Sequence, residues 1–233
     1  MKSWVTKNNY EIFLIQSERS NIYLVQRGDF CMLIDTGPSY ERRKLVKKLD
    51  KLNVRHINYL LLTHTHYDHV QNAAFVQKKY QCKILVHAAE ADVLRNGLSP
   101  LPKGTIWVTK LLMGALKLSG IQVRHQPCDA DVVLKENRFF LPEWDSDTYI
   151  LHTPGHSAGS VSLIVDSEIA IVGDAMMGTY YNSITVPFAD DVEQVVQSQI
   201  MLFDTHCALF LPGHGAAIER KLVEKALAKQ KHL

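Results

Sequence analysis

The chain has 233 residues, of which 46% are hydrophobic and 21% are charged, and its formal net charge is +2. This length and composition suffice for one sizeable core, so we expect a single domain over residues 1–233. The near-neutral charge argues against a nucleic-acid-binding protein, because the densest basic block, ERRKLVKK at 41–48, fits the solvated face of an amphipathic helix. The apolar stretch near the N-terminus is too short for a signal peptide, and no segment approaches a membrane span.

Short apolar runs alternate with helical patterns along the first part of the chain. Three successive runs separated by polar turns predict strands that pair antiparallel, at 11–15, 21–25 and 30–34. Further strands are expected at 58–62 and 83–86. The spacing of apolar residues predicts helices at 40–52, 70–80 and 88–95.

The second part of the chain begins with a less regular stretch at 97–147. A helix is expected at 105–118, with short strands near Val123 and at 132–134 and 138–141. Regular elements then resume, with strands at 148–151, 161–165, 168–172 and 207–211 and helices at 190–203 and 216–230. Strands first and alternating helices later favour two sheets packed together with helices outside.

Four cysteines are scattered through the sequence without a short CxxC pair, namely Cys31, Cys82, Cys128 and Cys207. Two of them lie inside apolar runs. This pattern is typical of reduced thiols in the core of a cytosolic protein rather than of a disulfide framework. We therefore expect a cytoplasmic protein without disulfides.

Histidines and aspartates follow the apolar runs where predicted strands end. The run at 58–62 leads into HTHYDH, which places His64, His66, Asp68 and His69 within six residues. Three later strands end near His156, Asp174 and His214, each beside a glycine. Because loops at strand ends carry the ligand sites of layered α/β proteins, these side chains are candidate ligands.

Each candidate also has an ordinary structural interpretation when it is taken alone. Asp68 can cap a helix, and a histidine after Pro-Gly can belong to a simple turn. The cluster at 64–69 is harder to explain in that way. Side chains at i and i+2 of an extended segment point to the same side, and three imidazoles with a carboxylate suit zinc or a similar metal. The other histidines are expected to be structural or exposed, and these are His56, His87, His125, His152, His206 and His232.

Five motifs in order resemble the metallo-β-lactamase fold superfamily of metallo-hydrolases. They are IDTG with Asp35, HTHYDH at 64–69, TPGHSAGS with His156, GDAMMG with Asp174 and PGHG with His214. The resemblance implies an αββα sandwich, in which two mixed sheets lie face to face with helices outside.

The resemblance also implies a dinuclear metal site. Within it, His64, His66 and His156 would hold one ion, Asp68, His69 and His214 the other, and Asp174 would bridge the two. Asp35 would be a buried support of the metal loop rather than a ligand. The implied ions are two divalent metals, with zinc expected first and iron or manganese as alternatives.

The implied chemistry is hydrolysis of a small ester, thioester or lactone by a hydroxide that bridges the two metals, with Asp68 as the catalytic proton carrier. The superfamily also contains mononuclear iron enzymes of the persulfide dioxygenase kind and phosphodiesterases, and these remain alternatives, as does a metal-binding sensor without turnover. Full-length glyoxalase II carries a helical C-terminal domain, which we do not expect in this protein because only residues 216–233 follow the last motif. Met177 stands where lactonases carry a tyrosine. The expected partner is a small-molecule substrate, without nucleic acid or membrane, and a homodimer is an open alternative.

Residues 97–147 are the candidate for a lid insertion within the single domain. The helix expected there is rich in large apolar residues, including Trp107, Leu111 and Met113. It is either a core helix packed on a sheet or a helix that roofs the metal site and supplies an apolar wall for the substrate.

Overall fold

The computed structural model describes residues 1–230, and the chain falls into two compact units. The first unit comprises residues 1–100 and 122–135. The second comprises residues 101–121 and those from 136 onward. Among the described residues, no helix has the length and apolar character needed to span a membrane. The single-domain organisation with a lid insertion at 97–147 stays a prediction.

The first unit contains a seven-stranded mixed sheet, ordered β1-β2-β3-β4-β5-β6-β9. Its first four strands pair antiparallel, and β4, β5, β6 and β9 pair parallel. The strands span Ser3–Val5, Glu11–Ser17, Asn21–Arg27, Phe30–Ile34, Tyr59–Leu61, Lys83–His87 and Val132–Leu134. The predicted antiparallel pairing of the three early strands is therefore confirmed.

Helices α1, α3 and α4 cover one face of this sheet. They span Arg42–Lys51, Ala73–Tyr80 and Ala88–Asn96, and they bury Leu49, Val76 and Leu94 in one core with strand residues such as Leu33 and Leu60. This apolar burial supplies the main stabilisation of the unit, because each fully buried large aliphatic side chain contributes about 1.5–3 kcal/mol. The packed layer of helices and sheet fixes the positions where β4, β5 and β6 end.

The helix predicted at 70–80 is in fact interrupted. A short helix α2 spans Tyr67–Val70, and α3 begins only at Ala73. Between them, Asn72 leaves the helical path with φ −103° and ψ 7°. Its buried side-chain amide donates to the backbone carbonyls of Thr36, Gly37 and Pro38. The interruption thus connects the loop after β4 to the histidine-rich stretch. It also supplies a hydrogen-bond donor to the three carbonyls of that loop.

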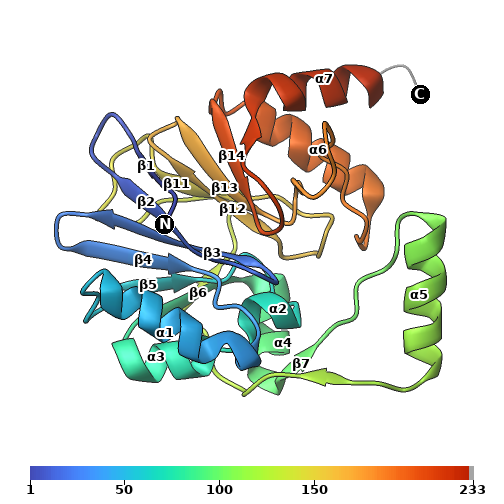
Figure 1. Cartoon of the computed structure of the whole chain (residues 1–233), viewed down its shortest axis with the longest axis horizontal. Helices are drawn as coiled ribbons and strands as arrows, with labels where there is room; N and C mark the ends of the chain where they lie inside the picture. The colour runs from blue at the N-terminus through green and yellow to red at the C-terminus, as the bar shows by residue number, and fades with distance from the viewer. Residues whose placement is uncertain (231–233) are drawn as a thin grey trace. The chain divides into compact units, whose positions relative to one another are not determined.

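The second unit contains a six-stranded sheet, ordered β10-β11-β12-β13-β14-β15, in which only β13 and β14 pair parallel. The strands span Arg138–Phe139, Tyr149–His152, Val161–Val165, Ile169–Gly173, Leu209–Pro212 and Ile218–Glu219. Helices α6 (Val192–Phe203) and α7 (Arg220–Gln230) contact each other and lie side by side in Figure 1. The helix predicted from residue 216 begins later, because Ile218 and Glu219 first pair with β14.

Helix α5 (Trp107–Leu118) lies in an excursion whose two ends pair as the short strands β7 (Leu98–Ser99) and β8 (Val123–Arg124). In Figure 1 it stands apart from α6 and α7. Only Thr109 and Met113 of this helix are buried, whereas Trp107 is 78% exposed. A helix buried flat in the core would hide far more of its apolar face, so the core-helix interpretation of Trp107 is wrong.

Trp107→Ala and Met113→Ala should therefore differ in their effect on stability. Met113 is 7% exposed, and its truncation is expected to lower the free energy of unfolding by about 2 kcal/mol. Trp107→Ala is expected to change it by less than about 0.5 kcal/mol, as exposed substitutions usually do. Urea unfolding of both variants measures the difference. Equal losses in the two variants would contradict the exposed position of Trp107.

Candidate metal centre

Asp35 is the centre of a buried hydrogen-bond network at the end of β4. Its Oδ1 accepts from the Thr63 backbone amide, and its Oδ2 accepts from the Thr63 hydroxyl and from His69 Nδ1, all at 2.8 Å. Asp35 is 1% exposed and has a φ of +60°, which is uncommon for a non-glycine residue. Aspartate tolerates this conformation better than most residues, and here the conformation turns its carboxylate toward the stretch after β5. Asp35 is thus buried and hydrogen-bonded to Thr63 and His69, and its role as a support of metal ligands stays a prediction.

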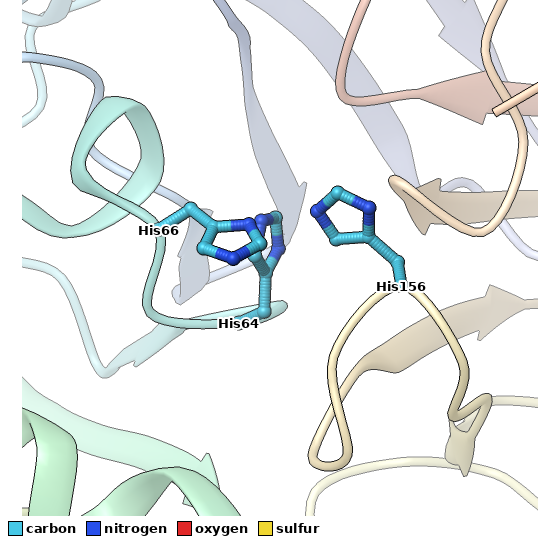
Figure 2. Close-up of side chains that lie close together, drawn as sticks. All are labelled: His64, His66 and His156. Carbon is cyan, nitrogen blue, oxygen red and sulfur yellow. The ribbon is translucent and has the colours of Figure 1, made fainter. Parts of the chain in front are cut away.

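Two further histidines lie within five residues of the end of β5. Figure 2 shows the imidazoles of His64 and His66 beside each other, with ring centroids 4.7 Å apart and nearly perpendicular planes. The His64 ring also lies 4.2 Å from the ring of His69. His64 Nδ1 is 3.0 Å from the Thr63 hydroxyl oxygen. Because that hydroxyl donates to Asp35, it accepts from His64 Nδ1–H, which makes Nε2 the candidate ligand atom of His64.

Asp68 belongs to the short helix α2, and the positively charged side chain of Arg19 lies beside it. The Arg19 Nε lies 3.5 Å from Asp68 Oδ2, and the Arg19 guanidinium also donates to the Tyr67 hydroxyl at 2.6 Å. The Ser20 hydroxyl donates to the Asp68 backbone carbonyl. The turn between β2 and β3 therefore holds Asp68 from two sides. Sequence reasoning missed Arg19, since a charged residue in a polar hairpin turn gives no local sign of such a contact.

In the second unit, His156 lies on the loop after β11 (Figure 2). Its Nδ1 donates to the backbone carbonyl of Phe188 at 2.7 Å, which makes Nε2 the candidate ligand atom. The loop is anchored to the chain before α6, where the amides of Asp190 and Asp191 donate to the carbonyls of His156 and Gly155. Sequence reasoning missed Phe188, because a backbone carbonyl leaves no trace in the residue type.

Asp174 and His214 lie on the loops that follow the parallel strands β13 and β14. The Asp174 Oδ2 is 3.4 Å from His214 Nε2 and 3.4 Å from His156 Nε2. The second unit thus brings its three predicted ligands together, with His156 and His214 each in contact with the Asp174 carboxylate. The first unit separately gathers His64, His66 and His69, with Asp68 on the adjoining turn of α2.

Two glycines permit the approach of Asp174 and His214. Gly178 and Gly215 form a backbone bridge between the two loops, and the Gly178 amide donates to the His214 carbonyl at 2.9 Å. A Cβ on Gly215 would lie 2.2 Å from the Gly178 carbonyl carbon, and Gly215 also has a φ of +85°. Side chains at these positions would push the two loops apart.

The other described histidines, which were not ligand candidates, are either hydrogen-bonded, buried or exposed. His87 caps α4, His152 contacts the Ala158 carbonyl, and His56 and His206 are exposed. His125 is buried rather than at the surface, and its burial lowers its pKa. His232 lies outside the described residues.

The four cysteines are free. Burial raises the pKa of the Cys82 thiol to about 12 and that of Cys31, Cys128 and Cys207 to about 11. At neutral pH they are therefore protonated thiols rather than thiolate nucleophiles.

The sequence model of the metallo-beta-lactamase superfamily matches residues 17–214. The chain belongs to this superfamily. The match covers every candidate ligand from His64 to His214. Together with the structural neighbours described below, membership confirms the expected fold class, an α/β sandwich with two mixed sheets and outer helices.

Known proteins similar to the chain include a probable metallo-hydrolase of Methanocaldococcus jannaschii, which is 25% identical over 206 residues, or 86% of this chain and 90% of the relative. Among solved structures, a metallo-beta-lactamase superfamily protein from Sulfolobus tokodaii matches with a TM-score of 0.65 and 21% identity, over 94% of this chain and 86% of that chain. A third protein, TTHA1623, was solved in a di-iron-bound form. It matches with a TM-score of 0.62 and 23% identity, over 89% of this chain and 93% of that chain.

Proposed function

We propose that the chain is a metal-dependent hydrolase that binds two divalent ions and cleaves a small ester, thioester or lactone. One ion would be held by His64, His66 and His156 and the other by Asp68, His69 and His214, with Asp174 between them. The observation that carries the proposal is the orientation of the imidazoles. His64, His69 and His156 each have Nδ1 engaged by a hydrogen-bond acceptor, which is the arrangement that orients Nε2 toward a metal.

The donor set fits divalent metals of intermediate softness. Imidazole nitrogens and carboxylate oxygens suit zinc and iron alike, and the buried thiols are not part of the set. The relative from M. jannaschii is named a probable metallo-hydrolase, and TTHA1623 was solved with two irons, which supports a dinuclear centre. Two bound ions would supply hydroxide at neutral pH by lowering the pKa of water toward about 7.

The residues around the ligands supply orientation and proton transfer. Asp35 and Phe188 fix the rings of His69 and His156, so that the donors need little rearrangement when they bind. Asp68 is the carboxylate that we assign to proton transfer to the departing atom. The Arg19 Nε lies 3.5 Å from Asp68 Oδ2, so this ion pair helps to hold the carboxylate in position.

Hydrolysis of four chromogenic substrates tests the proposal: an ester, a thioester, a lactone and a phosphodiester. We expect turnover of at least one of the first three, its loss after chelation, and its return when zinc is added. Activity that survives complete chelation would contradict a metal-dependent reaction. Turnover of the phosphodiester alone would contradict the proposed substrate class.

Asp68→Asn is expected to lower kcat by about 100-fold to 10,000-fold while KM changes little, because an amide keeps the shape of the carboxylate but cannot carry a proton. Metal content is measured in the same preparation, so that loss of a ligand is separated from loss of proton transfer. Asp92→Asn, on the exposed side of α4, is the matched control and should keep full activity. Full activity of Asp68→Asn at normal metal content would rule out the assigned role.

A further inference from the structure

The residue between His64 and His66 has its own buried support, which involves none of the predicted ligands. Thr65 is fully buried, and its backbone amide donates to Glu90 Oε2 at 3.2 Å. The Thr65 hydroxyl donates to the same carboxylate oxygen. Glu90 lies in the first turn of α4 and is 3% exposed. A glutamate at the start of a helix is usually solvated, so the sequence alone gave no reason to single it out.

The third polar group of Thr65 is also engaged. Ser99, on β7, donates its hydroxyl to the Thr65 carbonyl at 3.0 Å. The same hydroxyl oxygen lies 3.2 Å from His125 Nδ1, and His125 Nε2 is 3.3 Å from the Leu94 carbonyl at the end of α4. The amide, hydroxyl and carbonyl of Thr65 are therefore all held by groups from α4 and β7. These contacts lie entirely within the first unit.

These contacts matter because Thr65 lies between two predicted metal ligands, His64 and His66. In an extended segment, neighbouring side chains point to opposite sides and side chains two residues apart point to the same side. His66 has extended backbone angles, with φ −66° and ψ 148°. The hydrogen bonds to Thr65 therefore fix one side of the segment, and the imidazoles of His64 and His66 lie on the opposite side. Fixing one residue at three points removes backbone freedom that metal binding would otherwise have to remove.

We propose that Glu90 is a positioning residue for the metal ligands His64 and His66, acting through its two hydrogen bonds to Thr65. The carboxylate orients the segment that carries the two imidazoles. Glu90 does not touch the metal or the substrate. The inference rests on the proposed metal-binding function and deepens it, because it assigns the preorganisation of two ligands to a residue outside the ligand set.

Three variants separate this role from general stabilisation. Glu90→Ala removes the one oxygen that accepts both hydrogen bonds, and Thr65→Val removes the hydroxyl but keeps the shape and the backbone amide. Thr65→Ser restores the hydroxyl and is the conservative rescue. Asp92→Ala is the matched control, because Asp92 lies on the same helix and is exposed and paired only with Arg95 among the contacts described. Each protein is stripped of metal and titrated with zinc in competition with a chromophoric chelator, and then with cobalt.

We expect the zinc dissociation constant of Glu90→Ala to rise by about 10-fold to 100-fold, the range typical of residues that orient metal ligands. Thr65→Val should show a rise of about 10-fold and Thr65→Ser a value within about threefold of the wild type, since the hydroxyl is restored. At saturating cobalt, the visible spectra of Glu90→Ala and Thr65→Val should differ from that of the wild type. A purely structural role would lower thermal stability but leave the spectrum of the filled site unchanged.

The outcomes distinguish the two proposals. Wild-type protein that binds neither zinc nor cobalt would overturn the proposed function and this inference with it. Normal metal binding by the wild type, with Glu90→Ala and Thr65→Val indistinguishable from Asp92→Ala in affinity and spectrum, would overturn the positioning role alone. Where Glu90→Ala does not fold, the comparison of Thr65→Val with Thr65→Ser decides the question in the same way.

Discussion

Asp35→Asn is expected to lower the free energy of unfolding by about 2–4 kcal/mol and to weaken zinc binding about 10-fold to 100-fold. Asn keeps the shape and the left-handed backbone of Asp35, but it offers one acceptor oxygen where three donors converge. At least one buried donor is then unsatisfied, and the charge that holds His69 Nδ1 is lost. Urea unfolding of the metal-free protein and chelator competition measure the two effects separately.

Asp129→Asn is the matched control for this substitution. The Asp129 side chain is 76% exposed and pairs with Arg95 at the surface, so its replacement should change stability by less than about 0.5 kcal/mol. An Asp35→Asn protein as stable as this control, with unchanged zinc affinity, would show that the network around Asp35 does not support the ligands.

Gly215→Ala should be the second severe substitution. A methyl group there meets the Gly178 backbone at 2.2 Å and must also adopt a φ of +85°. We expect a loss of about 3 kcal/mol in unfolding free energy, because strain and displaced backbone add together. The displacement should separate His214 from Asp174, so that the protein also binds fewer than two metal ions.

Gly120→Ala isolates the conformational part of this loss. Gly120 has a φ of +68°, and an added Cβ would meet nothing within 4 Å. Its substitution should cost about 1 kcal/mol and leave metal binding unchanged. Equal costs at Gly120 and Gly215 would mean that the close approach of the two loops contributes nothing to the fold.

The candidate ligands were predictable because each is a distinctive residue type at the end of an apolar run. His64, His156 and Asp174 all follow strands whose apolar patterns are clear in the sequence. The burial of Asp35 was also anticipated, through the resemblance of IDTG to the superfamily motif.

The residues that hold the ligands were not predictable in the same way. Glu90 acts on Thr65 from 25 positions away, and Phe188 acts through a backbone carbonyl. Such contacts depend on how distant segments pack, and residue type alone does not encode them. The late start of α7 has a similar cause. Residues 218–219 pair with β14 as strand β15, and the helix begins only after them.

Metal content per chain tests the central claim most directly. Wild-type protein, His66→Ala and His214→Ala are purified identically, and their bound metals are counted by elemental mass spectrometry. The account predicts two divalent ions per chain in the wild type and a loss of about one ion in each variant. A wild-type chain without bound metal, or a metal content that neither substitution changes, would contradict it.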